Sequence, residues 1–361
     1  MIVLVVNMHA CVTYSHVGSW YVNSPVEPSL GEKIPYIVWQ AHLQSFFMGL
    51  LFFIAGYFAN GSLARRGPGP FLRERLARLG LPTLLYMLVI HPFIVRGIDP
   101  WHIDFGPAAA YYGRYIASGR FIGSTGPLWF AEALLLFCAV LAAWRSLWGA
   151  PAAPGPASPV PPSAGAILLY ALVTGAATFA VRLVQPLGTN ILNLQLGYFV
   201  QYVAAFAAGV AAARNGWLLA LSASRASGWI GVAAVFLGPA SLLAMLVAGG
   251  KSGVDSFAGG WHWAALGLSM WEQFAGIGLS LGLMYFFARH LAADGAVLRW
   301  MADRSFAVYV LHAPVIIWLY LVLPQSLPIS ALVLVMTVAG LGLTFVLADL
   351  ARRTPGLRAI L

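Results

Sequence analysis

Apolar segments recur along the whole chain and are separated by short stretches richer in Gly, Pro and charged residues. A helix needs about 20 apolar residues to cross the hydrocarbon core of a bilayer. The pattern therefore predicts an all-α, polytopic membrane helix bundle of about ten spans, at residues 2–15, 41–60, 79–95, 127–148, 164–184, 194–213, 228–248, 262–288, 305–323 and 329–348. Because the first segment is shorter than a full crossing, we expect that the true start lies upstream of Met1.

The composition and the charge distribution agree with a membrane protein. Of the 361 residues 60% are hydrophobic and 9% are charged, whereas soluble domains have roughly 25% charged residues. With the amino terminus inside, fourteen Lys and Arg residues fall in inner segments and six in outer ones. Positive residues remain cytoplasmic, so we expect both termini in the cytoplasm. Topology and anionic lipid headgroups then account for the net charge of +9, and no nucleic-acid partner is predicted.

The connections between the predicted spans differ in character. Residues 149–163 (GAPAAPGPASPVPPS) contain six prolines, which is typical of a polyproline-like linker. We interpret this segment as a cytoplasmic linker between spans four and five, within a single membrane-embedded domain of residues 1–361. Two long outer loops, 17–40 and 97–126, are rich in aromatic residues such as Trp20. These residues suit either stacking on a sugar ring or an interfacial aromatic belt.

His9 lies within the first apolar segment and is the strongest candidate for chemistry. An ionisable side chain at bilayer depth costs a few kcal/mol unless it has a partner or a function. Thr13 and His16 follow His9 after one and two helical turns, so the three side chains share one face of a helix. We expect this face to point into the bundle and away from lipid.

Other ionisable residues are predicted to lie inside the membrane as well. Glu272 and His312 fall near the middle of their spans, whereas Glu132 and His91 fall nearer the outer surface. A polar cluster in the bundle interior is the economical arrangement for such residues. The alternative is that each of them only bonds a neighbouring helix.

The sequence gives little support for a zinc site or for a phosphate-binding loop. His9 and His16 lack the nearby carboxylate or cysteine ligands of a zinc site, so no metal is predicted. The Gly250-Lys251-Ser252 triplet is similar to the end of a phosphate-binding loop, but Met245 occupies the position of the first glycine. Cys11 and Cys138 both fall in predicted spans, and we interpret them as packing residues.

A series of short motifs resembles the membrane-bound acyltransferase family 3. Each motif is weak by itself, but their order and spacing are specific and extend over nearly the whole chain. The motifs are most similar to the branch that includes glucan biosynthesis protein C, and they lie at residues 49–58 (GLLFFIAGYF), 71–82 (FLRERLARLGLP), 126–130 (GPLWF), 196–202 (LGYFVQY), 214–217 (RNGW), 271–272 (WE), 309–314 (YVLHAP) and 353–356 (RTPG).

The resemblance implies an integral membrane enzyme, here expected in a bacterial inner membrane. Such an enzyme moves an acyl group, often acetyl or succinyl, from cytoplasmic acyl-CoA to a hydroxyl of a carbohydrate or cell-envelope glycan, without a permanently bound cofactor. The catalytic histidine of the family falls on His9. The sequence departs from the family in two ways: an arginine expected eleven positions before His9 would precede Met1, and Ala55 stands where the family has serine.

The residues allow roles to be assigned. A histidine can take the proton of an attacking hydroxyl, and burial at mid-bilayer favours its uncharged, basic form. We therefore expect His9 to act as general base, with Glu272 or His16 orienting it. Arginines suit phosphate groups, so coenzyme A is expected at one or more of Arg73, Arg75 and Arg78, although inner loops are rich in arginine for topological reasons as well. The expected substrate contacts are Trp129, Glu132 and His312.

The same intramembrane residues would also suit a protein that moves solutes or lipids instead of an enzyme. A proton-coupled transporter or flippase could employ the His and Glu side chains as a proton relay. Transporter folds often contain two similar halves, and no such repeat is visible here. A purely structural scaffold would leave His9, Glu272 and His312 unexplained.

Overall fold

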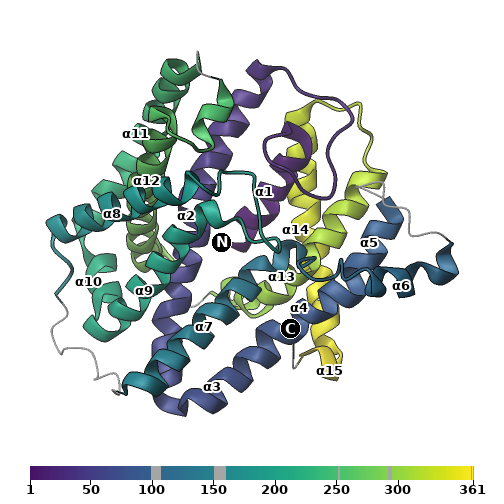
Figure 1. Cartoon of the computed structure of the whole chain (residues 1–361), viewed down its shortest axis with the longest axis horizontal. Helices are drawn as coiled ribbons and strands as arrows, with labels where there is room; N and C mark the ends of the chain where they lie inside the picture. Colours follow the sequence, from purple (N-terminus) through teal and green to yellow (C-terminus); the bar gives the residue numbers. More distant parts are fainter. Residues whose placement is uncertain (99–106, 150–159, 251–252, 292–294, 359, 361) are drawn as a thin grey trace.

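The computed structural model describes residues 1–361 except 99–106, 150–159, 251–252, 292–294, 359 and 361. The described residues form a bundle of α-helices (Figure 1). Their only β-type pairing is an isolated bridge between Ile191 and Leu194. The predicted all-α architecture is therefore confirmed.

The helices follow one another in a regular succession along the chain. Their bounds are α1 Ile2–Ser15, α2 Leu30–Arg66, α3 Pro68–Arg75, α4 Leu81–Leu85, α5 His91–Ile98, α6 Ala108–Ala117, α7 Trp129–Trp148, α8 Ala164–Arg182, α9 Phe199–Asn215, α10 Trp217–Ala223, α11 Arg225–Gly249, α12 Trp263–His290, α13 Ala296–Val322, α14 Ile329–Arg353 and α15 Pro355–Arg358. Two π-helical segments, Leu76–Gly80 and Tyr86–Ile90, join α3, α4 and α5 into one long unit.

Eight helical segments of the described chain are long and apolar enough to cross a membrane. They are Leu30–Arg66, Pro68–Ile98, Gly126–Trp148, Ala164–Arg182, Leu196–Asn215, Arg225–Gly249, Ala296–Val322 and Ile329–Arg353. The two other predicted spans are helical as well: α1 has 14 residues and α12 has 28. Polar residues inside α12, including Glu272 and Gln273, lower its hydropathy. The exact number of crossings and the cytoplasmic location of the termini stay predictions.

The second helix is longer than its apolar segment predicts. Ser29 caps the first turn, because its hydroxyl accepts from the backbone N–H of Glu32 while the Glu32 carboxylate accepts from the Ser29 N–H. This reciprocal capping box starts α2 eleven residues before Ala41, the expected beginning of the span. The capped extension carries Trp39 and Gln40, whose side chains donate to Asn7 Oδ1 at 2.7 Å and to Ser15 Oγ at 2.9 Å on α1.

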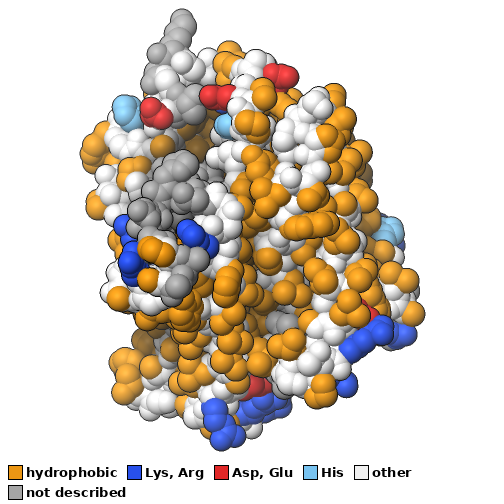
Figure 2. All heavy atoms as spheres, turned by 90° about the vertical axis from the view of Figure 1, so that its right-hand side faces the viewer, with side chains coloured by type: hydrophobic (Ala, Val, Ile, Leu, Met, Phe, Trp, Pro, Cys, Tyr) orange, Lys and Arg blue, Asp and Glu red, His pale blue; other side chains and the backbone are white. Residues whose placement is uncertain are grey.

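Large hydrophobic side chains cover much of the outer surface of the bundle. On α11, Trp229 is 74% exposed, Phe236 70% and Val247 81%. Figure 2 shows hydrophobic side chains over most of another face. Apolar surface on this scale is unfavourable in water and is the expected surface of a helix bundle in lipid. The chain is a multi-pass integral membrane protein.

Close helix packing in the interior depends on glycine. Gly56 of α2 and Gly209 of α9 face each other's helices, and a Cβ at either position would clash with the backbone carbonyl of Phe206 or Phe53. Small residues allow helix backbones to approach closely inside membranes. The helix α1, which carries His9, contacts α2, α13 and α14.

Parts of some predicted connections lie outside the described residues. Within the proline-rich segment 149–163, residues 150–159 are not described. Its ends are ordered: Gly149 ends α7 in a left-handed conformation, and the Ser163 hydroxyl accepts from the Ala166 N–H at the start of α8. Residues 251 and 252 of the Gly-Lys-Ser triplet, and residues 99–106 of the second aromatic loop, also lie outside the described part.

Candidate active site

His9 is covered by a tryptophan that the following loop folds back over α1. The Trp20 ring stacks on the His9 imidazole with 4.3 Å between centroids and 25° between planes. The helix ends where His16 adopts a left-handed conformation with φ 57°, which reverses the chain. The Trp20 Nε1–H donates to Thr13 Oγ1 at 2.9 Å, and the Thr13 hydroxyl donates to the His9 carbonyl at 2.9 Å. Thr13 therefore holds Trp20 over the imidazole.

A second imidazole lies beside that of His9. His312 of α13 is fully buried, and its ring centroid lies 5.1 Å from that of His9. The His312 Nδ1 lies 2.7 Å from the Tyr309 carbonyl. Because a carbonyl only accepts, His312 Nδ1 carries the proton and its Nε2 is an acceptor. That Nε2 and the Nδ1 of His9 are both buried and lack a hydrogen-bond partner among the described residues.

The two imidazoles have different access to their surroundings. His9 is half-buried, whereas His312 is completely enclosed. No carboxylate of the described residues hydrogen-bonds either ring. Of the two residues, His9 is the less buried, so it is the better candidate to take a proton from a hydroxyl that reaches this pair.

Glu272 has a different partner from the one that the sequence suggested. The carboxylate Oε2 accepts from Arg182 Nη2 at 2.6 Å, and both side chains are buried. Arg182 also donates to the Gly197 carbonyl at 3.1 Å and to Ser269 Oγ at 3.2 Å. The ion pair thus ties the C-terminal end of α8 to α12, and none of the hydrogen bonds of the described residues links Glu272 to His9.

His16 likewise does not orient the His9 ring through a described hydrogen bond. Its Nε2 lies 2.8 Å from the Ser24 carbonyl. The left-handed backbone at His16 directs its ring to the loop that follows α1 instead of along the α1 face. The regular helical periodicity on which the shared face rested ends at Ser15.

The residues at the start of α7 lie next to this site through a series of rings. The Tyr309 ring lies 6.1 Å from His312 and 6.1 Å from Phe130. Trp129 stacks on Tyr202 with centroids 5.6 Å apart. Trp129 also packs edge-on against Phe130 with centroids 6.5 Å apart, so Phe130 and Tyr309 connect Trp129 to the His9–His312 pair.

A carboxylate with one unsatisfied oxygen lies in the same turn as Trp129. Glu132 of the first turn of α7 has a buried Oε2 without a hydrogen-bond partner among the described residues. The turn that leads into α7 is held by Asn193, whose Nδ2 donates to Thr125 Oγ1 at 2.9 Å and to the Gly126 carbonyl at 2.8 Å. A substrate hydroxyl is a suitable donor to the Glu132 carboxylate.

The three candidate donor-binding arginines are not equivalent. Arg73 and Arg78 are exposed, and Arg78 Nε lies 3.6 Å from Glu74. Arg75 is half-buried, and its guanidinium lies 5.2 Å from the centre of the Phe71 ring. Its Nε is buried without a described partner. Of the three, Arg75 is the one that points toward the bundle.

Two important residues were not identified from the sequence as part of an ordered site. An aromatic residue such as Trp20 in a long loop is equally typical of an interfacial aromatic belt. No pattern in the sequence indicated that Trp20 stacks on His9. Arg182 was counted only as one of the six outer positive residues, without a partner, whereas it lies in the last turn of α8 and is 0% exposed. No group of three or more His, Cys, Asp or Glu in the described chain could hold a metal ion.

The chain was compared with known proteins. The family model described as an acyltransferase domain matches residues 1–352. No curated protein and no solved structure matches the chain. Because the match covers nearly the whole helix bundle, including both imidazoles and the Arg182–Glu272 pair, this integral membrane protein belongs to the acyltransferase family 3 and is an acyltransferase.

Proposed function

We propose that the protein transfers an acetyl or succinyl group from acyl-CoA to a hydroxyl of a carbohydrate or cell-envelope glycan, with His9 as general base. The observation that carries this proposal is the half-buried His9 imidazole, which contacts both Trp20 and His312 inside an apolar bundle. An O-acyl transfer requires a base near neutral pH, and histidine is the side chain best suited to that role.

In the proposed reaction, one proton passes from the acceptor hydroxyl to His9 and then from His9 to the thiolate of coenzyme A. His9 accepts the proton of the acceptor hydroxyl as its oxygen attacks the thioester carbonyl. The new C–O bond forms, the C–S bond breaks, and coenzyme A leaves as a thiolate that takes the proton from the imidazolium. General base catalysis of this kind contributes about 10² to 10⁴ in rate.

His312 has the position of an orienting group in this scheme. Its Nδ1–H is used by the Tyr309 carbonyl, so its Nε2 can only accept a proton. We propose that it accepts from the Nδ1–H of His9. That hydrogen bond would fix the His9 tautomer and leave the His9 Nε2 as the basic atom. His312 thus takes the orienting role for which the sequence had suggested Glu272 or His16.

The donor is proposed to bind on the cytoplasmic side, with Arg75 as its main phosphate contact. The unpartnered, buried Nε of Arg75 supports this choice over Arg73 and Arg78, because guanidinium groups bind phosphate by paired hydrogen bonds. The acceptor is proposed to approach from the outer side, where Trp129 offers a face for a sugar ring and Glu132 an acceptor for its hydroxyls. This assignment suits the glucan biosynthesis protein C-like branch and a bacterial inner membrane.

The proposal is tested with purified protein in lipid nanodiscs and acyl-CoA labelled in its acyl group. We expect the His9→Ala variant to lose transfer by about 10² to 10⁴, while it keeps its helical content. His290→Ala, at the exposed end of α12, serves as the matched control and should transfer normally. Full transfer by the His9 variant would remove His9 from the mechanism.

Two further comparisons address the substrates. Parallel assays with acetyl-CoA and succinyl-CoA identify the acyl group. Mass spectra of envelope glycans from cells with and without the gene identify the acceptor. Identical glycan acylation in both strains would contradict the proposed acceptor class.

A further inference from the structure

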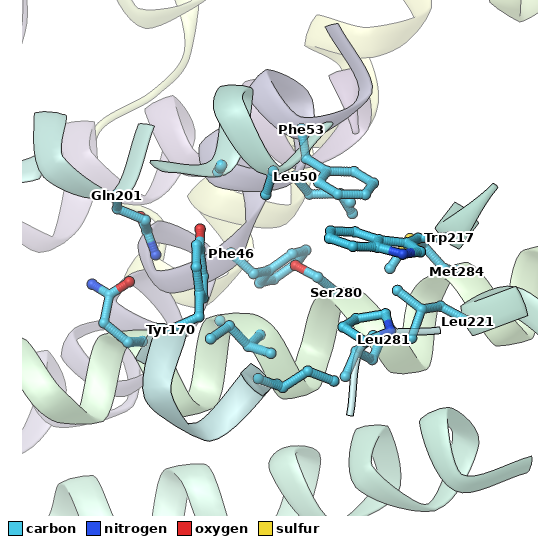
Figure 3. A pocket seen from close by; sticks show the side chains of 18 of the residues that line it. Phe46, Leu50, Phe53, Tyr170, Gln201, Trp217, Leu221, Ser280, Leu281 and Met284 are labelled. Carbon is cyan, nitrogen blue, oxygen red and sulfur yellow. The ribbon is translucent and has the colours of Figure 1, made fainter. Parts of the chain in front are cut away.

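A cavity of about 280 Å³ lies among α2, α8, α9, α10 and α12. None of its lining residues belongs to α1 or α13, so it is separate from the His9–His312 pair. Figure 3 shows Gln201 and Tyr170 at one end of the cavity and Trp217, Leu221 and Met284 at the other.

The walls of this cavity are hydrocarbon and aromatic along most of their length. Phe46, Leu50 and Phe53 of α2 form one side, and Leu281 and Met284 of α12 contribute to another. None of the lining residues carries a charge. A charged ligand group would lose its hydration there without compensation, so the walls favour an uncharged, mostly hydrocarbon ligand.

The buried end of the cavity carries an unsatisfied hydrogen-bond donor. Gln273 lines the cavity and is 2% exposed, and its Nε2 lacks a partner among the described residues. The neighbouring Gln201 is 9% exposed, and its own Nε2 is used by the Ser45 carbonyl at 2.6 Å. A buried donor without an acceptor is unfavourable. A ligand that supplies an acceptor oxygen would relieve this cost.

The opposite end of the cavity reaches the bundle surface. Ala166 is exposed, and Trp217, Leu221 and Met284 are half-buried. The large residues on the outer face of α8 near this opening, such as Leu168 and Leu169, are exposed and hydrophobic. A ligand can therefore leave its tail in the lipid while its head reaches the buried amides.

We propose that this cavity binds a neutral lipid whose head is a single carbonyl or hydroxyl oxygen. The head enters first and its oxygen accepts from Gln273 Nε2, and the hydrocarbon tail lies along Phe46, Leu50 and Leu281 toward the opening. This inference is independent of the proposed acyl transfer, because no residue of the His9 site takes part in it.

The test uses the full-length protein in phosphatidylcholine nanodiscs and a hexadecanol that carries a photoreactive diazirine in its chain. We expect saturable labelling that maps to residues lining the cavity. Gln273→Met keeps the length of the side chain but removes the donor, and it should weaken apparent binding about three- to tenfold. Gln195→Met, at an exposed position of an outer loop, is the matched control.

A second variant blocks the cavity without changing the donor. Ser280 lines the middle of the cavity, and Ser280→Phe should abolish saturable labelling, whereas Ser241→Phe on the exposed face of α11 should leave it unchanged. Labelling that does not saturate, or that is the same in wild type and in both cavity variants, would overturn the proposal. Equal labelling by the corresponding photoreactive fatty acid would overturn the requirement for a neutral head. The assay contains no acyl donor, so its failure is distinct from failure of the proposed transferase activity.

Discussion

The imidazole of His9 lies beside that of His312, with 5.1 Å between ring centroids, although the two residues are more than 300 positions apart in the chain. Each ring has one buried nitrogen without a described partner. The Tyr309 carbonyl fixes the proton of His312 on its other nitrogen. This geometry supports the proposal that one ring orients the other.

Removal of the orienting nitrogen should impair turnover more than donor binding. We expect His312→Ala to lower kcat about 10- to 100-fold with little change in the KM for acyl-CoA, since the losses seen for groups that orient a metal-ligating histidine are of this size. His312→Gln retains an acceptor oxygen and should recover part of kcat. Steady-state kinetics of both variants, with thermal unfolding as a check of folding, measure the effect. A rise in KM alone would assign His312 to substrate binding instead.

The hydrogen bond between Thr13 and Trp20 should matter for activity through the position of the indole ring. Thr13→Val removes the acceptor of Trp20 Nε1–H and is expected to reduce transfer about three- to tenfold, the range for one lost hydrogen bond. Thr13→Ser keeps the hydroxyl and serves as the control. If the two variants have equal activity, the stacked Trp20 does not depend on Thr13.

Breaking the buried Arg182–Glu272 ion pair should strongly lower the stability of the folded protein. Glu272→Gln leaves a buried guanidinium without its counter-charge, and the loss of one partner of such a pair costs about 3–5 kcal/mol. The double variant Arg182→Met and Glu272→Leu should be less destabilised than either single change. Unfolding in detergent followed by circular dichroism compares them. A stable double variant without transferase activity would give Glu272 or Arg182 a role in catalysis.

Arg73 and Arg75 should differ in their effect on the binding of the acyl donor. Arg75→Gln is expected to raise the KM for acyl-CoA about 10-fold or more, because charge-assisted hydrogen bonds contribute about 1.5–3 kcal/mol. Arg73→Gln, at an exposed position of the same helix, should change it much less. Equal effects of the two substitutions would indicate that the basic surface attracts the donor only by its total charge.

The close contact between α2 and α9 should depend on the absence of a side chain at Gly209. Gly209→Ala places a methyl group against the Phe53 carbonyl and should destabilise the bundle by about 1–3 kcal/mol. Gly342→Ala is the matched helical control, since nothing lies within 4 Å of the added Cβ. There we expect no loss of stability, because alanine is the better helix former. Thermal unfolding of the two variants side by side measures the difference.

The sequence by itself determined the helical architecture of this protein. Apolar segments of sufficient length leave only helices as a way to satisfy backbone hydrogen bonds in lipid, and each of the ten predicted segments coincides with helix. The same reasoning identified His9, His312 and Glu272 as residues that needed partners inside the bundle, because a polar group in an apolar environment is costly wherever the chain places it.

Only the tertiary structure decided which partners these residues have. Helical periodicity relates residues within one segment, but it carries no information on which segments lie side by side. The pairing of His9 with His312, of Glu272 with Arg182 and of Trp20 with Thr13 depends on the packing of α1 against α13, of α8 against α12 and on one left-handed residue at the end of α1. These relations arise from the contact of distant helices and from a turn, where local sequence patterns end.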